Sequence, residues 1–193
     1  MYKYPIAMDR HNNKPLVPRY SNYEDLLCFK KTRVIYDMTF HFCSRFVPIT
    51  SRTNDQMIQA ARSSKQNIIE GCVDTATSSH SGLMLLNVSR GSLHELLEDY
   101  CDYIRVHGGV QWQSDSKEYK AMQKLGREHD DPRYFVELAE SRNDITIANM
   151  VIVLIKQADI LLYKLIESLS KKFADEGGFK ERMYTVRTQN RGY

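Results

Sequence analysis

Residues 53–72, TNDQMIQAARSSKQNIIEGC, are the most informative part of the sequence for the fold, because their apolar side chains recur with the period of a helix. Steps of three and four link the residues that can share one buried face: Met57, Ala61, Ser64, Ile68 and Cys72. Thr53 or Asn54 can cap the first turn. Small side chains between residues 60 and 64 let a neighbouring helix approach closely. This stretch therefore predicts a helix packed tightly against another helix.

Two more segments have the same period. The first runs from Ser21 or Asn22 to just before Pro48, with acidic residues in its first turn, where the helix dipole favours them. The other runs from about Ser81 to His107 and ends at the glycine pair 108–109, which is typical of a C-terminal cap. We expect both to be long helices.

A fourth helix is predicted from Asp131–Pro132 to about Phe173, with proline at the first helical position. Between residues 145 and 155 it is apolar nearly all round, interrupted only by Thr146 and Asn149. Such a helix must be covered on every side. It either lies centrally within the chain or turns part of its surface to another subunit. Residues 110–131 before it form a charged connector, with room for a short helix over 117–127.

Length and composition indicate one globular domain. The chain has 193 residues, 42% hydrophobic and 26% charged, with only nine glycines and five prolines. We therefore expect an all-α protein, an up-down antiparallel four-helix bundle with long helices over residues 20–175. Residues 1–19 read as an extended basic N-terminal arm and residues 176–193 as a basic C-terminal tail.

The charge is concentrated at the ends of the chain. Residues 1–19 hold four basic and one acidic residue, a net charge of +3, and residues 176–193 hold four basic and two acidic residues, a net charge of +2. Because the whole chain has a net charge of +3, residues 20–175 sum to −2. So small a total does not by itself indicate a nucleic-acid-binding protein.

The cysteines and the N-terminal sequence indicate a cytoplasmic protein. The four cysteines include no C-x-x-C pair, and residues 1–13 lack the apolar core of a signal peptide. The longest apolar run, residues 150–155, is far shorter than the roughly 20 residues that span a bilayer. We expect no membrane partner.

Catalytic and metal-binding motifs are missing from the sequence. No Glu-x-x-His or H-E-x-x-H motif accompanies its histidines, and it has no phosphate-binding glycine loop or nucleophile elbow. An acidic run on the third helix, Glu95, Glu98, Asp99 and Asp102, either binds a divalent cation or is a solvated helix face. We favour the solvated face and predict no enzyme, no catalytic residue, no cofactor and no metal.

Five basic residues fall on the first two predicted helices. If these helices are adjacent, their side chains form one positive surface able to contact nucleic acid: Lys30, Lys31, Arg33, Arg62 and Lys65. Ordinary surface charge is the alternative explanation.

Two segments together resemble a known family. QMIQAARSSKQNIIEG at residues 56–71 and SRGSLHELLE at residues 89–98 are similar to the second- and third-helix signatures of the bacterial four-helix-bundle family of ribosomal intervening-sequence proteins, and most of all to its suffix-domain subgroup. The matched region, with the first helix, covers roughly residues 20–105. Two departures stand out: Ile58 and Gln59 replace the family's paired arginines, which Arg62 and Lys65 partly substitute, and the 110–131 connector is longer than usual.

The resemblance implies an up-down bundle in a ring-like homo-oligomer, typically a pentamer, without enzymatic activity. Relatives include proteins encoded within ribosomal RNA insertions and a retroelement accessory protein that binds nucleic acid and a reverse transcriptase. The residues shared with the signatures include a structural set: Asn67, Glu70, Gly71, Arg90, Gly91, Ser92 and Glu95.

These shared residues have physical interpretations of their own. We expect Gly91, with the small residues of the second helix, to permit close helix packing. Arg90 can pair with an acid from another helix, with Glu70 as the candidate. A buried Asn67 would need hydrogen-bond partners and could fix helix register.

Two functions remain open from the sequence. The first is a non-enzymatic oligomeric scaffold or adaptor with a protein partner. The alternative is a nucleic-acid-binding module that contacts RNA or DNA through basic patches on a ring-like oligomer, since repetition of a weak patch raises affinity.

Overall fold

The computed structural model describes residues 23–75 and 78–176, together with residues 184 and 188. Most of these residues are helical and none of them lies in a strand, which confirms the all-α prediction. One 3-10 helix and six α-helices follow in order: η1 (Tyr23–Asp25), α1 (Leu27–Phe46), α2 (Arg52–Asp74), α3 (Ser79–Val106), α4 (Lys117–Glu128), α5 (Pro132–Glu140) and α6 (Asp144–Glu176). The predicted N-terminal arm, the Ser21 or Asn22 cap and nearly all of the basic tail lie outside the described residues.

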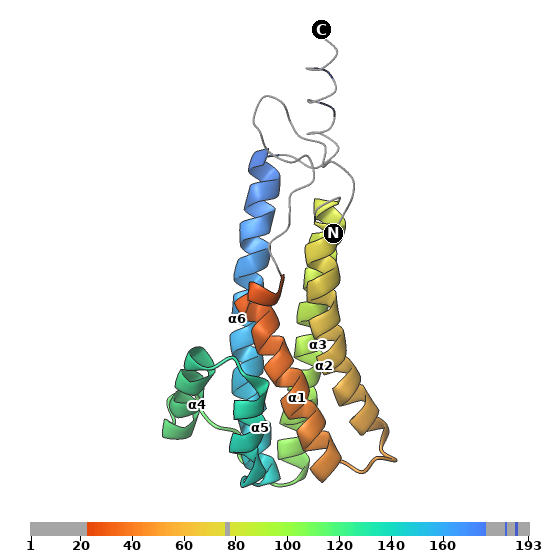
Figure 1. Cartoon of the computed structure of the whole chain (residues 1–193). Coiled ribbons are helices and arrows are strands. Elements are labelled where there is room, and N and C mark those ends of the chain that lie inside the picture. The colour runs from red at the N-terminus through yellow and green to blue at the C-terminus, as the bar shows by residue number, and fades with distance from the viewer. Residues whose placement is uncertain (1–22, 76–77, 177–183, 185–187, 189–193) are drawn as a thin grey trace.

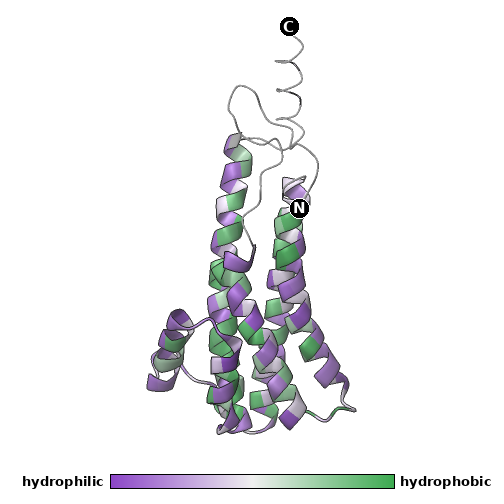
Figure 2. Cartoon of the chain, in the orientation of Figure 1, coloured by the Kyte–Doolittle hydropathy of each residue, from purple (hydrophilic) through white to green (hydrophobic). Residues whose placement is uncertain are grey.

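Four long helices, α1, α2, α3 and α6, pack around one hydrophobic core (Figure 1). α2 neighbours α1 and α3, and α6 neighbours α1 and α3. The short helices α4 and α5 lie beside α6 and α1 towards one end of the molecule. α4 is mainly hydrophilic in its colouring, whereas hydrophobic residues are frequent along the long helices (Figure 2).

Side-chain caps explain where several helices begin. The hydroxyl of Ser51 accepts a hydrogen bond from the Thr53 amide at the start of α2, and Ser78 and Ser116 have the same role for α3 and α4. At the other end of α3, Gly108 has a φ of 69°. The amides of residues 108 and 109 donate back to carbonyls of the last turn, so the predicted glycine cap is confirmed.

The single fourth helix expected over residues 131–173 is wrong. The chain breaks at residues 141–143 into α5 and α6. The side-chain oxygen of Asn143 accepts a hydrogen bond from the Thr146 amide at 2.8 Å, and Asp144 lies in the first turn of α6. Asn143 therefore caps a new helix, which frees α5 to pack on α1.

The apolar stretch of α6 is buried all round within a single chain. Every residue from 147 to 155 is buried, beneath α1, α3 and α4. The chain itself therefore covers this stretch, as the central position predicts, and contact of another part of α6 with a second subunit stays a prediction. α6 is long and apolar enough to cross a bilayer by length and composition, but 61% of its most apolar window is buried inside the fold, as in a core helix of a soluble protein.

The polar interruption at Asn149 fastens the connector to this helix. Its side-chain oxygen accepts the Trp112 amide at 2.7 Å, and its amide group donates to the carbonyls of Val110 and Ile145, both at 3.0 Å. Because the buried amide is fully satisfied, it positions residues 110–112 along the core at little cost.

Candidate functional site

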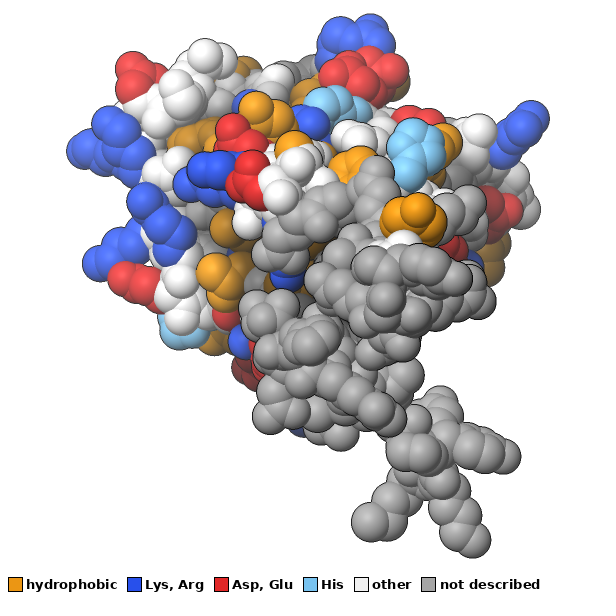
Figure 3. Space-filling model, turned by 90° about the horizontal axis from the view of Figure 1, so that it is seen from above, with side chains coloured by type: hydrophobic (Ala, Val, Ile, Leu, Met, Phe, Trp, Pro, Cys, Tyr) orange, Lys and Arg blue, Asp and Glu red, His pale blue; other side chains and the backbone are white. Residues whose placement is uncertain are grey.

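Three of the five predicted nucleic-acid contacts lie together where α1 packs on α2. Lys65 on α2 interacts electrostatically with Arg33 of α1 and with Arg62 one turn earlier. Arg33 and Arg62 are exposed. Asp37 lies among them and interacts with Arg33 and Lys65, so it partly offsets their charge. Seen from above, Lys and Arg side chains also gather along the left edge of the molecule, the side on which α4 lies in Figure 1, with acidic side chains interspersed (Figure 3).

Aromatic rings accompany this basic surface. The Lys65 ammonium lies 4.1 Å from the centroid of the Tyr36 ring, within cation–π range. One turn along α1, Phe40 is 55% exposed. Burial, followed by the neighbouring arginines, lowers the pKa of Lys65, while Asp37 opposes the shift. A positive surface with accessible rings can contact phosphates and stack bases.

Lys31 does not belong to the basic surface, and its prediction as a nucleic-acid contact is wrong. It is 2% exposed. Helix periodicity explains the difference, because Lys31 lies one turn after Leu27 and one turn before Ile35, on the side of α1 that faces the connector. Lys30 is half-buried and has no side-chain partner among the described residues.

Lys31 instead clamps the connector to α1. Its ammonium donates to the backbone carbonyl of Gly126, to that of His129 at 3.0 Å and to the carboxylate of Asp130 at 3.2 Å. The three donors of the ammonium therefore have three acceptors. Two of these acceptors lie at the C-terminus of α4, where helix carbonyls lack partners and the dipole favours a cation. Burial lowers the pKa of Lys31, and the hydrogen bond and charge of Asp130 counteract it.

The two signature segments lie against each other on α2 and α3 and are joined by serines. The Ser89 hydroxyl donates to the Ser64 carbonyl at 2.8 Å, and the two hydroxyl oxygens are 3.2 Å apart. The Ser92 hydroxyl donates to the Ser63 hydroxyl at 3.1 Å. Ala60 is also buried at this contact, so small residues bring these two helices together as predicted.

Glycines of this helix pair differ in role. A Cβ on Gly71 would lie 3.0 Å from the Gly82 carbonyl oxygen and from Leu86, so close packing requires glycine there. A Cβ on Gly91 would meet nothing within 4 Å, and the residue is exposed. The expectation that Gly91 permits close packing is therefore wrong within the chain. Asn67 also differs from expectation, because it is half-buried and donates only to Ser63 of its own helix, and so cannot fix register.

Arg90 pairs with Asp159 of α6, not with Glu70, which is exposed. The guanidinium donates two hydrogen bonds to the carboxylate, at 2.7 and 3.1 Å, and stacks over the Tyr163 ring. His94 approaches the same carboxylate at 3.2 Å. Although burial opposes it, Arg90 and then His94 hold the pKa of Asp159 below its usual value. This pair joins α3 to α6.

Part of the predicted acidic run borders a groove between α2 and α3. Glu95 and Asp99 line it with Ser92 and residues of α2, and its volume is about 700 Å³. Burial, then Asp102 and Glu95, raises the pKa of Asp99. Within 23–75 and 78–176, His, Cys, Asp and Glu side chains form no group of three or more that could hold a metal ion.

Comparison of the chain with protein-family models, with curated proteins and with solved structures gave no match.

The structural roles of two polar residues, Asn149 and Lys31, were not predicted from the sequence. The sequence does contain a sign of the role of Asn149, since a lone amide in an apolar stretch needs buried hydrogen-bond partners. The sign for Lys31 is weaker: it lies on the apolar side of the first helix, beside residues that prefer burial, which suggests that it is buried too. Neither signal identifies the partners, which come from the connector.

Proposed function

We propose that this protein is a non-enzymatic scaffold or adaptor, an up-down four-helix bundle that associates with further copies of itself. The observation that supports it is a stripe on the outer face of α3. Met84 and Val88 are 57% and 51% exposed, and the exposed Gly91 continues the same face. Glycine within a helix costs about 0.5–1 kcal/mol relative to alanine, and no contact inside the chain offsets this at Gly91. A second helix approaching this stripe would use all three residues.

The displaced pKa values are consistent with structural roles. Asp159 is held by Arg90, and burial raises the pKa of Tyr103 to about 12, with its hydroxyl donating to Asp144. The buried Cys28 thiol also has a pKa of about 12, because burial disfavours the thiolate. Each of these groups stabilises the fold in the protonation state that its pKa favours, which fits a protein that acts by binding.

Membership of the ribosomal intervening-sequence family is part of this proposal. Its support is that the two signature segments contact each other through Ser63, Ser64, Ser89 and Ser92. A ring-like oligomer such as a pentamer follows from that resemblance. A cytoplasmic location is also part of the proposal, and the four free cysteines support it.

Light scattering on the purified protein tests the scaffold. We expect a closed oligomer at micromolar concentration, and a mass of one 22.5 kDa chain would refute the proposal. Substitution of Met84 and Val88 by aspartate should dissociate the oligomer, because the carboxylates would be buried at the contact. The matched control is Ile49→Asp, since Ile49 is 88% exposed and lies outside the stripe.

The second candidate function is binding of single-stranded RNA or DNA. It is favoured by the cluster of Arg33, Arg62 and Lys65 with the Tyr36 ring. Mobility shifts at increasing salt test it. Arg33→Gln with Arg62→Gln should weaken binding and flatten its salt dependence, by about one unit of slope per lost phosphate contact. Lys120→Gln, an exposed cation on α4, is the control. Absence of binding at low salt would eliminate this candidate.

A further inference from the structure

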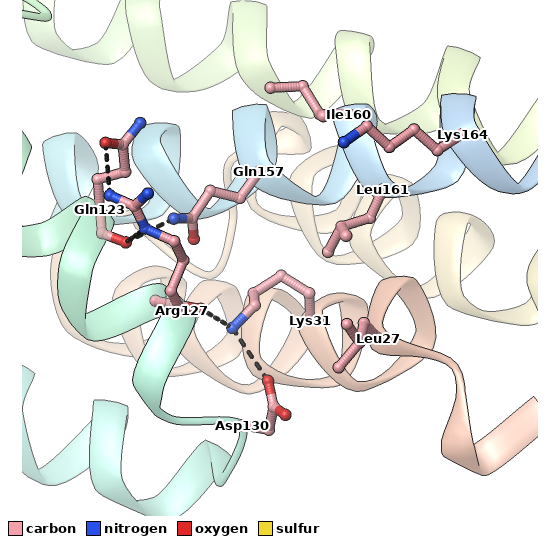
Figure 4. A pocket seen from close by; sticks show the side chains of 10 residues that line it. Leu27, Lys31, Gln123, Arg127, Asp130, Gln157, Ile160, Leu161 and Lys164 are labelled. Atoms are coloured by element: carbon pink, nitrogen blue, oxygen red, sulfur yellow. Dashed lines mark hydrogen bonds and ion pairs between the residues drawn. The ribbon is translucent and has the colours of Figure 1, made fainter.

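A pocket of about 330 Å³ lies between α1, α4 and α6, on the far side of α1 from the basic surface. This volume falls in the range of small-molecule sites. Lys31 and Asp130 form one wall, and Gln157 of α6 faces them (Figure 4). The Lys31 clamp keeps the α4 wall in place.

One buried polar atom in this pocket has no partner. The Gln157 side chain donates from its amide nitrogen to the Gln123 carbonyl at 2.7 Å. Its other atom, Oε1, is buried and accepts no hydrogen bond, and it is the only such side-chain atom among the described residues. An unsatisfied buried acceptor costs about 1–3 kcal/mol, so it requires an explanation. The atom lies against Gly126, so an N–H or O–H group of a ligand would satisfy it once the Gln157 amide turns towards the open side of the pocket.

The charge of the pocket favours an anion. Lys31 and Asp130 neutralise each other, which leaves Arg127 and Lys164 as uncompensated cations. Arg127 donates to the carbonyl and side-chain oxygens of Gln123, and its remaining N–H groups are available. Lys164 is exposed and has no partner among the described residues.

The rest of the lining is apolar and accessible. Leu27 and Ile160 are each 55% exposed, and both border the pocket together with the half-buried Leu161. Large apolar side chains left this accessible beside a cavity offer a surface for the apolar part of a ligand.

We propose that this pocket binds a small organic acid with an apolar body and one hydrogen-bond donor. The acid group faces Arg127 and Lys164, and the body lies on Leu27, Ile160 and Leu161. The donor bonds to Gln157 Oε1 after the Gln157 amide has turned away from Gly126. This binding is independent of the scaffold function, because the outer face of α3 contributes nothing to the pocket.

Titration of the ¹⁵N-labelled full chain with three matched probes tests the proposal by NMR. Indole-3-acetate has the acid, the ring and the N–H donor, naphthalene-1-acetate lacks the donor, and tryptamine reverses the charge. We expect saturable shifts of the Gln157 side-chain amide and the Leu161 backbone amide with indole-3-acetate. Binding should be weaker with naphthalene-1-acetate and absent with tryptamine. Equal shifts with tryptamine, or no saturable shift with either acid, would overturn the proposal.

Paired variants distinguish the pocket from general attraction of anions. Arg127→Gln with Lys164→Gln should raise the Kd for indole-3-acetate about tenfold, as expected for two modest charge contacts. Lys120→Gln with Lys171→Gln removes cations of the same two helices outside the pocket and should leave the Kd unchanged. The same loss in both double variants would refute the site.

An anionic lipid offers similar chemistry from a different source. Co-sedimentation with phosphatidylglycerol vesicles distinguishes the two. We expect no co-sedimentation that depends on Arg127 and Lys164. If vesicles bind through these two residues and indole-3-acetate does not, the pocket recognises lipid headgroups and the proposal is overturned.

Discussion

Replacing Lys31 by methionine should destabilise the protein more than any other removal of a single positive charge from α1. The substitution keeps the length of the side chain and deletes the ammonium. The carbonyl of Gly126, the carbonyl of His129 and the carboxylate of Asp130 then lose their shared donor. The Asp130 side chain is 36% exposed, so water can solvate it in part.

The magnitude follows from what remains buried. One buried carbonyl without a partner costs about 1–3 kcal/mol, and the partly buried charge of Asp130 adds to this, while methionine gains a little from apolar burial. We expect a loss of about 2–4 kcal/mol in the free energy of unfolding. For a chain of 193 residues this lowers Tm by about 5–12 °C.

Urea and thermal unfolding followed by helix circular dichroism measure the loss. Hydrogen exchange locates it, because amides of α4 and α5 should exchange faster while those of α2 and α3 keep their protection relative to global unfolding. Lys30→Met is the matched control and should change stability by less than about 0.5 kcal/mol, since its side chain has no described partner.

A double-mutant cycle isolates the pair. Asp130→Asn alone should cost less than Lys31→Met, because the two carbonyls keep their donor. If Lys31→Met matches Lys30→Met in stability, or leaves exchange in α4 unaltered, the clamp does not hold the connector and the reasoning is wrong.

Three further predictions test the packing and the titratable groups. Gly82→Ala should destabilise the protein by about 1–3 kcal/mol in urea unfolding, because its Cβ would lie 2.7 Å from a backbone oxygen. Gly91→Ala should stabilise the single chain by about 0.5–1 kcal/mol, because its Cβ would lie in open space. Equal effects of the two substitutions would contradict the packing. Arg90 lowers the pKa of Asp159 against the effect of burial, so Asp159 stabilises the fold fully above its usual pKa and loses this effect as the pH falls through the lowered pKa. Asp159→Asn should cost about 1–2 kcal/mol at pH 7, and its difference from wild type should begin to shrink only below about pH 4 and disappear below the lowered pKa. Burial raises the pKa of Cys28 to about 12, so this thiol should react with Ellman's reagent at pH 8 only after unfolding. The half-buried Cys101 is replaced by serine for this measurement, and rapid labelling that maps to Cys28 in the native protein would refute its burial.

The sequence predicted the long helices because their apolar period is strong, and composition favoured an all-α chain. It also predicted the close contact of the two signature helices from their small residues. The break at residues 141–143 was missed because the apolar pattern resumes at once after it. The Asn143–Asp144 pair is nevertheless a helix start signal, and its side-chain cap explains why one predicted helix is two.

Partners across helices were harder to predict than helices. Arg90 was assigned to Glu70 because both belong to the signatures, but periodicity turns Arg90 towards α6, where Asp159 lies. The signature predicts close packing at Gly91 because the residue is small, but the structure leaves open space there and places the close contact at Gly71 instead. A single helical face predicts burial, whereas an ion pair depends on the relative rotation of two helices.

The burial of Lys31 also changes how the connector should be viewed. The sequence predicts residues 110–131 as a charged connector with room for a short helix over 117–127, and α4 confirms that helix. In the structure, Asn149 binds the start of the connector and Lys31 binds the end of α4, so its two ends are fixed to the core by satisfied polar groups. The same connector supplies one wall of the pocket that contains the unpartnered Gln157 oxygen. Without this connector the pocket would lack that wall, so we expect ligand binding at the pocket to depend on the connector, while the proposed assembly through α3 would not.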